Sequence, residues 1–290
     1  MPYRHLQAKH KLDKRPAVYR AAMHLDRRGD LAAYRFASLP REGLEALVST
    51  RTGGTSAEPY ASLNLGLGAG DDPDAVIENR SRLLSAYGLD PSRSVWCRQT
   101  HSNRVAVVSA GDAGRGALDM DSAIQETDAL VTDAIGLSLC VTVADCVPIA
   151  IYDPMAPAIA VVHAGWGGTA SRIASRTVEV MQEQFGTDPA RLLAGIGPSI
   201  GPTDYEVGDE VIDRVHEAYG PRASTLLQPG DGGKALLDLW RANSLDLEEA
   251  GVDPRNIEVA GISTATALDR FYSHRTEGTT GRFAAVVSLT

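Results

Sequence analysis

The chain has 290 residues, of which 43% are hydrophobic, and carries a formal net charge of −9. This length and composition allow one large domain with a sizeable core, and the negative charge argues against nucleic acid or an anionic membrane as the main partner. No stretch approaches the ~18 uninterrupted apolar residues of a membrane span. We therefore expect a soluble protein with no nucleic-acid or membrane partner.

The N-terminal segment differs in charge from the rest of the chain. Residues 1–30 carry a net charge of +5, which leaves −14 for the remaining 260 residues. The segment lacks the apolar stretch of a secretory signal and, having no Ser, does not resemble a transit peptide. We predict a solvated extension over residues 1–34, and a folded domain over residues 35–290.

Glycine, proline and apolar periodicity define the first elements of that domain. A strand is predicted at 44–50. Asp72 caps a helix that begins with proline and runs over 73–87. The stretch 95–108 has the pattern of two strands joined in a hairpin, which places His101 near the turn. A polar, glycine-rich surface loop follows.

The second half of the domain alternates strands and helices. The predicted strands are 129–132, 137–143, 147–152, 158–163, 192–197, 257–262 and 282–289. The predicted helices are 169–185, 208–219 and 234–250. With no repeat and no proline-rich linker, the pattern predicts a single α+β domain.

Three polar groups lie in or beside strands that should be buried. Cys146 follows Asp145 inside an apolar run, and His163 ends the next apolar strand, before a glycine-rich turn. Buried polar groups are costly unless they have partners, so these residues suggest a site. With a second histidine, they match an open zinc centre in which Asp145 orients a histidine ligand. They equally match a cysteine hydrolase, with Cys146 as nucleophile, His163 as base and Asp145 or another acid as orienting group.

Arginine and cysteine positions add two further expectations. Arg51 follows a strand and precedes two glycines, so it either clamps an anion or forms a surface salt bridge. The three cysteines cannot all be paired in disulfides, which makes a reducing cytoplasm the simplest compartment.

A set of short motifs occurs in order along residues 36–290. They are Asn64-Leu65-Gly66-Leu67, Gly70-Asp71-Asp72 with Asn79-Arg80, Gln99-Thr100-His101, Thr127-Asp128-Ala129-Leu130-Val131-Thr132, Ala144-Asp145-Cys146-Val147-Pro148, His163-Ala164-Gly165-Trp166, Gly197-Pro198, Tyr205-Glu206-Val207-Gly208 and Thr280-Gly281-Arg282. Together they resemble the YfiH family, the laccase-domain or "polyphenol oxidase" proteins associated with purine nucleoside phosphorylase activity.

The resemblance implies a fold, a metal and a reaction. The fold is a layered α/β/β/α domain with mixed sheets, and the metal is one Zn²⁺ per chain, with copper as an in vitro substitute. The reaction is phosphorolysis of adenosine, inosine, guanosine and methylthioadenosine, with deamination of adenosine as a side activity. Carried onto this chain, the implied metal ligands are His101, Cys146 and His163. From the charge of such a site we predict Cys146 and Asp145 as catalytic residues. The predicted phosphate or nucleoside contacts are Arg51, Asn64, Gln99 and Arg282.

The chain departs from the family pattern at several positions. Gly167 stands where the family usually has Arg, Ser102 where it has Gly, and Thr203 and Asp204 precede Tyr205 where a cysteine is usual. His274 and Thr276 interrupt the aromatic-Ser-Tyr-Arg-Arg pattern. None of these touches an implied metal ligand, but the loss of a cation at 167 affects the expected phosphate site.

The older laccase label makes a copper oxidase a rival hypothesis. A multicopper laccase needs about ten histidines for its copper centres, and the chain has seven, three of them in the N-terminal segment. Counting therefore excludes a multicopper enzyme and leaves a mononuclear copper phenol oxidase as an alternative. No feature of the sequence supports the further alternative, a binding module that catalyses no reaction.

Overall fold

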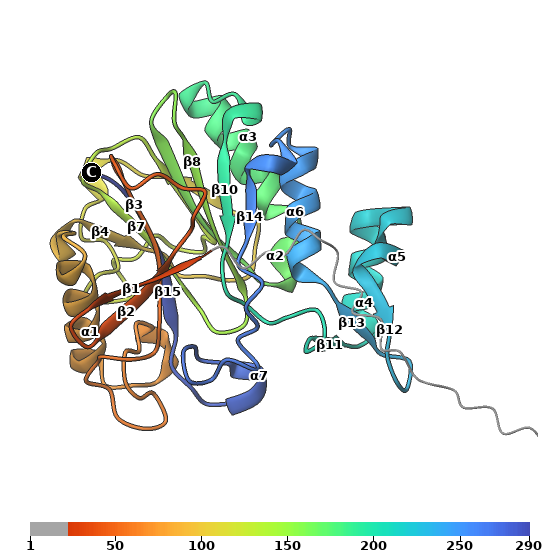
Figure 1. Ribbon diagram of the computed structural model, residues 1–290, viewed down its shortest axis with the longest axis horizontal. Helices are drawn as coiled ribbons and strands as arrows, with labels where there is room; N and C mark the ends of the chain where they lie inside the picture. The colour runs from red at the N-terminus through yellow and green to blue at the C-terminus, as the bar shows by residue number, and fades with distance from the viewer. Residues whose placement is uncertain (1–22) are drawn as a thin grey trace, which may run out of the picture.

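The computed structural model describes residues 23–290, which form two six-stranded mixed sheets and one small sheet (Figure 1). The first sheet has the order β1 (His24–Arg28), β2 (Leu31–Arg35), β3 (Leu44–Ser49), β15 (Phe283–Leu289), β7 (Ser138–Val143) and β4 (Ser94–Trp96). The second has the order β14 (Ile257–Val259), β10 (Leu193–Ile196), β8 (Val147–Asp153), β9 (Ala158–Ala164), β6 (Ala129–Thr132) and β5 (Val105–Val107). The small sheet has the order β11 (Glu206–Val207), β13 (Ala235–Leu237) and β12 (Leu227–Pro229).

Three helices cover the outer faces of the two large sheets. The described α-helices are α1 (Pro73–Ala86), α2 (Trp166–Ala170), α3 (Ile173–Phe185), α4 (Asp209–Tyr219), α5 (Ala223–Leu226), α6 (Leu239–Glu249) and α7 (His274–Glu277). α1 packs on the first sheet, and α3 and α6 pack on the second, while α4, α5 and the small sheet form a lobe at one end (Figure 1). None of the described helices is both long and apolar enough to cross a membrane.

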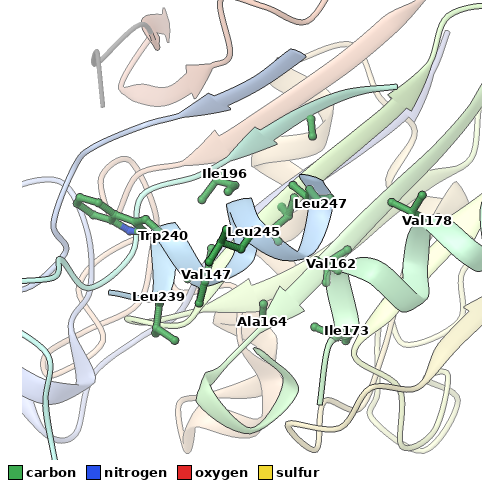
Figure 2. Packing of buried hydrophobic residues seen from close by; sticks show 14 of the residues in the cluster. Val147, Val162, Ala164, Ile173, Val178, Ile196, Leu239, Trp240, Leu245 and Leu247 are labelled. Atoms are coloured by element: carbon green, nitrogen blue, oxygen red, sulfur yellow. The ribbon is translucent and has the colours of Figure 1, made fainter. Parts of the chain in front are cut away.

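Alternating side chains along the strands build the layers. On β9, Val162 and its even-numbered neighbours face α3 and α6, whereas Val161 faces the first sheet. Figure 2 shows members of this outer set, among them Val162 of β9, Ile173 of α3 and Leu245 of α6, which belong to one buried cluster. Because strand side chains alternate between faces, a strand buried on both sides is apolar throughout. The predicted α+β domain and its α/β/β/α layering are confirmed.

The predicted hairpin at 95–108 is wrong. β4 pairs in parallel with β7 in the first sheet, and β5 pairs in parallel with β6 in the second. The segment between them therefore crosses from one layer to the other. Both strands gain a buried partner this way, which a two-stranded hairpin would not supply. His101 lies on this crossing.

Two of the predicted helices differ from the observed ones at their N-terminal ends. The helix predicted at 169–185 is divided into α2 and α3 at Arg172, whose φ of 64° is left-handed. The helix predicted at 234–250 begins only after Asp238, whose side chain accepts a hydrogen bond from the Arg241 N–H. The preceding residues form β13, because β11 and β12 pair with it on both sides.

The predicted solvated extension is wrong from His24 onward. β1 and β2 form an antiparallel pair at the edge of the first sheet, and every residue of β2 is buried. Arg35 also forms ion pairs with Asp26, at 2.8 Å, and with Glu45, at 2.6 Å. Leu31 and Ala33 of β2 pack with the α1 layer and Tyr34 packs in the cluster on the opposite face, so burial on both faces explains the strand. Residues 1–22 of the predicted extension lie outside the described residues.

Candidate metal centre and substrate cavity

His101, Cys146 and His163 converge at one point. One ligand atom from each residue lies within 4.8 Å of the others. Cys146 Sγ is 3.7 Å from His101 Nε2, and the two imidazole rings meet edge to face, with centroids 4.9 Å apart. His163 lies on β9, Cys146 directly precedes β8, and His101 lies on the crossing between the sheets.

The backbone around the three residues has an uncommon conformation at His101 and a close approach at Gly165. His101 has a φ of 60°, a left-handed conformation that non-glycine residues rarely adopt and that often occurs at functional sites. The β8–β9 register brings Gly165 beside Cys146. A Cβ atom at Gly165 would lie 2.5 Å from His101 Cδ2 and 3.1 Å from Cys146 Sγ. Only glycine at 165 leaves room for both side chains.

Asp128, directly before β6, holds two of the three residues in place. It is fully buried, and its carboxylate accepts a hydrogen bond from His163 Nδ1 at 2.8 Å. It also accepts from the backbone N–H groups of His101, at 3.0 Å, and Ser102, at 2.8 Å. This bond assigns the proton of neutral His163 to Nδ1 and leaves Nε2 free as a ligand.

Electrostatics favour a thiolate at Cys146. Burial alone would raise the pKa of Cys146, but the positive charge of His163 and hydrogen bonds from His101 and His163 lower it to about 6. Burial would lower the pKa of His163, but the Cys146 thiolate and Asp128 raise it to about 9. Burial would raise the pKa of Asp128, yet His163 and Ser102 hold it well below its usual range. Two imidazoles and one thiolate fit a tetrahedral metal with one open position, so the described donor set fits the metal that the sequence implied.

A cavity of about 570 Å³ opens over the three residues. Its lining is cationic and contains no carboxylate among the described residues, although the chain is acidic overall. The charged or titratable side chains that line it are Arg80, Arg98, Arg282, His101, His163, His274, Cys97 and Cys146. Such a lining favours an anionic ligand beside the candidate metal centre.

Arg51 and Asn64 lie outside the lining of this cavity. The Arg51 guanidinium forms a 2.8 Å ion pair with Glu277, donates to the Ala61 and Leu268 carbonyls, and lies over the Tyr272 ring. Of the two alternatives for Arg51, these contacts favour the salt bridge over the anion clamp. Asn64 Oδ1 accepts from the backbone N–H of Arg282, at 2.8 Å, so Asn64 shapes the cavity wall without lining it.

Asp145 does not orient a histidine ligand. Its φ is 85°, and its carboxylate accepts from the Thr264 hydroxyl and the Arg275 backbone N–H, both at 2.6 Å. The orienting function expected at Asp145 belongs to Asp128, whose only signal in the sequence was a buried acid in a motif before a strand.

Gln99 and Arg282 do line the cavity. The Gln99 amide exchanges hydrogen bonds with the Thr142 backbone, at 2.8 and 2.9 Å, which fixes its side chain against the end of β7. Arg282 Nη1 donates to the carbonyls of Thr280 and Gly281, and no carboxylate among the described residues pairs with it. Burial lowers the pKa of Arg282, while the charges of Cys146 and Asp145 act in the opposite direction.

Gly167 faces the crossing that carries His101. A Cβ atom there would lie 3.0 Å from the His101 carbonyl oxygen. A side chain at 167 would therefore have to shift this crossing, and glycine lets α2 approach it closely.

Comparison with known proteins identifies the family. Residues 45–290 match the family described as "Multi-copper polyphenol oxidoreductase laccase". The chain is 39% identical over 249 residues to "Purine nucleoside phosphorylase YlmD" of Geobacillus stearothermophilus, covering 86% of this chain and 91% of that protein. It is 35% identical over 248 residues to "Purine nucleoside phosphorylase YfiH" of Escherichia coli, covering 86% of this chain and 95% of that protein.

Solved structures give the same result. The crystal structure of YlmD from Geobacillus stearothermophilus superposes with a TM-score of 0.89 at 36% identity, covering 93% of this chain and 99% of that one. The YfiH protein of Bacillus licheniformis superposes with a TM-score of 0.88 at 34% identity, covering 92% and 99%. The chain belongs to the YfiH family of laccase-domain proteins, whose curated relatives are named purine nucleoside phosphorylases.

Proposed function

We propose that the protein is a zinc-dependent purine nucleoside phosphorylase. The observation that carries the proposal is the His–Cys–His cluster at the base of a cationic cavity that has no carboxylate in its lining. Phosphorolysis brings a dianion to the ribose of a neutral nucleoside, so the site must attract phosphate and shield it from water. A cavity of about 570 Å³ is of the size that ligand pockets commonly have.

Phosphate binding falls to Arg282 in this proposal. Its guanidinium faces the cavity, and the charges of Cys146 and Asp145 act on it, so it lies on the side of the candidate metal centre. Two of its donors are used by backbone carbonyls, which fix the group and leave its other edge for a ligand. Arg51, bound to Glu277, has no part in phosphate binding.

The metal in the proposal is one Zn²⁺ held by His101, Cys146 and His163, with copper as an in vitro substitute. When bound, it supplies a Lewis acid beside the phosphate and the nucleoside. The chain itself orients His163 through Asp128, and it excludes other side chains from the ligand cluster through Gly165. Gln99 is the candidate nucleoside contact, since it lines the cavity in a fixed orientation.

The substrates we propose are adenosine, inosine, guanosine and methylthioadenosine, with deamination of adenosine as a side activity. The relatives are named purine nucleoside phosphorylases, and this supports the class of reaction for this chain.

A cysteine hydrolase is the second candidate, and one observation favours it. Cys146, His163 and Asp128 form a chain of thiolate, imidazole and carboxylate, which is the arrangement of an activated nucleophile. Metal content separates the two. About one zinc per chain in the purified protein, lost in Cys146→Ala, supports the phosphorylase. Metal-free protein with activity that a thiol alkylator abolishes supports the hydrolase.

Product analysis tests the reaction itself. The protein is incubated with adenosine, with and without phosphate, and the products are separated by chromatography. Adenine that forms only with phosphate supports phosphorolysis, and inosine formed without phosphate supports the deaminase side activity. If neither adenine nor inosine forms under either condition, the proposal is wrong.

A further inference from the structure

His274 is an imidazole in the cavity that the candidate metal cluster does not use. It is the first residue of α7, and it lines the same cavity as His101, Cys146 and His163. Its Nδ1 lies 2.7 Å from the Gly278 carbonyl oxygen. Because a carbonyl only accepts, Nδ1 carries a hydrogen, and Nε2 is the ring nitrogen left for a ligand.

An extensive set of bonds holds α7 in place. The Arg275 backbone N–H donates to Asp145 at 2.6 Å, and the Ser273 backbone N–H donates to Glu277 at 2.9 Å. Glu277 in turn pairs with Arg51 at 2.8 Å. A helix of four residues has almost no stability of its own, so these contacts fix its position. Asp145 and Arg51, both expected at the site from sequence, thus anchor the segment that presents His274.

The chemistry of the cavity makes His274 distinct. Among the described lining residues, only the three residues of the cluster, Cys97 and His274 have side chains that can release or take up a proton. Burial raises the pKa of Cys97 far above its usual range, so that thiol holds its proton. Burial lowers the pKa of Arg80 to about 9, which still leaves its guanidinium charged near neutral pH. His274 is exposed to solvent, so its proton can be replaced after each transfer.

We propose that His274 is the proton donor to the departing purine, an inference that rests on the proposed phosphorolysis. As the bond between ribose C1′ and purine N9 breaks, its electron pair moves into the purine ring. A phosphate oxygen forms the new bond to C1′. The imidazolium Nε2–H of His274 passes its proton to N7 of the purine, and the neutral imidazole regains a proton from water. The Gly278 carbonyl keeps its hydrogen bond to Nδ1–H throughout.

A nucleoside whose base needs no proton tests this assignment. 7-Methylguanosine already carries a positive charge on its imidazole ring, so its base leaves as a neutral molecule. We compare kcat/KM at saturating phosphate for inosine and 7-methylguanosine in wild type and in His274→Gln. Loss of a general acid typically costs about 10²- to 10⁴-fold, so inosine should lose about 100-fold or more. 7-Methylguanosine should change by less than about threefold, because its transition state uses no donated proton.

The controls separate this inference from the proposed function. His216→Gln, at an exposed histidine on α4, should leave both substrates unchanged. Suppose that wild type releases hypoxanthine from inosine. If His274→Gln then lowers kcat/KM equally for both nucleosides, or lowers it for neither, His274 is not the proton donor. If wild type cleaves neither nucleoside, the phosphorolysis proposal itself fails. Equal melting temperatures of wild type and His274→Gln show that the variant is folded.

Discussion

Asp128 links two of the candidate metal ligands through a single buried carboxylate. Besides His163 Nδ1 and the backbone of His101, it accepts from the Ser102 hydroxyl at 2.7 Å. Several donors around one anion fix the direction of each group. The position of His101 and the tautomer of His163 therefore depend on the same residue.

Substitution of Asp128 should weaken metal binding. Asp128→Asn keeps the size of the side chain but replaces one acceptor oxygen by a donor, which opposes the N–H groups around it. We expect zinc affinity, measured by competition with a chelator, to fall by about 10- to 100-fold, as is typical when the group that orients a histidine ligand is lost. Asp133→Asn, at an exposed acid nearby in sequence, is the control and should bind zinc like wild type. Wild-type affinity in Asp128→Asn would contradict the orienting role.

Substitutions of Arg282 and Arg51 should affect the apparent KM for phosphate differently. Arg282→Ala should raise the apparent KM for phosphate by roughly tenfold or more, equivalent to about 1.4 kcal/mol, because a charged donor is lost from the cavity. Arg51→Ala should leave it nearly unchanged, since Arg51 pairs with Glu277. Initial rates against phosphate concentration at fixed inosine measure both. A larger effect from Arg51 would show that our phosphate site is in the wrong place.

For single residues, the sequence predicts which side chains belong to the site better than it predicts which groups they contact. Cys146 and His163 stand out as polar residues in or beside apolar strands, and the family resemblance adds His101. The structure brings the three together. Asp128 and Asp145 look alike in sequence, since each is an acid beside a buried strand. The pairing of β6 with β9 brings His163 to Asp128, and the crossing from β4 to β5 brings His101 there, so both contacts depend on the sheet pairing.

At the scale of elements, α7 and the strand end at Arg51 depend on one another. The side chains of Arg51 and Glu277 are only 14% and 24% exposed, so their ion pair is partly shielded from water. We expect Arg51→Ala to lower the free energy of unfolding by about 1–3 kcal/mol, through the loss of the pair and of the hydrogen bonds to backbone carbonyls.

Urea denaturation of Arg51→Ala, Glu277→Ala and the double variant measures this pair. Two residues in contact should give a coupling energy of about 0.5 kcal/mol or more. Additive effects of the two substitutions would mean that the ion pair does not hold α7.

Helix α6 carries a buried acid that makes stability depend on pH. Asp246 is fully buried, and Arg172 lies 2.8 Å away at the break between α2 and α3. Burial raises the pKa of Asp246 to about 7, against the attraction of Arg172. The folded state therefore binds the carboxyl proton of Asp246 more tightly than the unfolded state does. The contribution of this proton to the free energy of unfolding is complete below about pH 4 and is lost as pH rises through about 7.

Asp246→Asn removes this titration. We expect its unfolding free energy, relative to wild type, to rise steadily between about pH 4 and pH 7 in urea denaturation. Asp253→Asn is the control, because hydrogen bonds from Arg255 hold the pKa of Asp253 near 2, outside this range. A difference between Asp246→Asn and wild type that does not vary with pH would show that Asp246 stays ionised in the folded protein.

Local signals predict some elements well and fail for others. The Asp72 and Pro73 signal locates α1, whose observed start is Pro73. The helix predicted over 234–250 is correct only from Leu239 onward, because pairing with β11 and β12 overrides the local preference of its first residues. Arg172 breaks the helix at 169–185 without glycine or proline, so nothing in the local sequence marks the left-handed turn.

Over the whole molecule, the family resemblance implies the layers of the fold, but the domain boundary is not predicted. Apolar strands that are buried on both faces need a covering layer on each side, which accounts for the α/β/β/α arrangement. The change in charge along the chain predicts a boundary near residue 34. β1 is indeed rich in charge, with the sequence HLDRR, yet it pairs with β2 at the sheet edge, where side chains reach solvent. Charge marks an exposed edge strand as readily as it marks a chain outside the fold.

Detection of the sugar phosphate tests the central claim most directly, namely that this cavity carries out phosphorolysis. Inosine and phosphate are incubated with the zinc-loaded protein, and ³¹P NMR follows the phosphate. We expect a new phosphate ester to appear in equal amount to the hypoxanthine released, and to be absent with Cys146→Ser. Hypoxanthine released without a new phosphorus signal would mean that water, rather than phosphate, attacks the ribose, and would contradict the account.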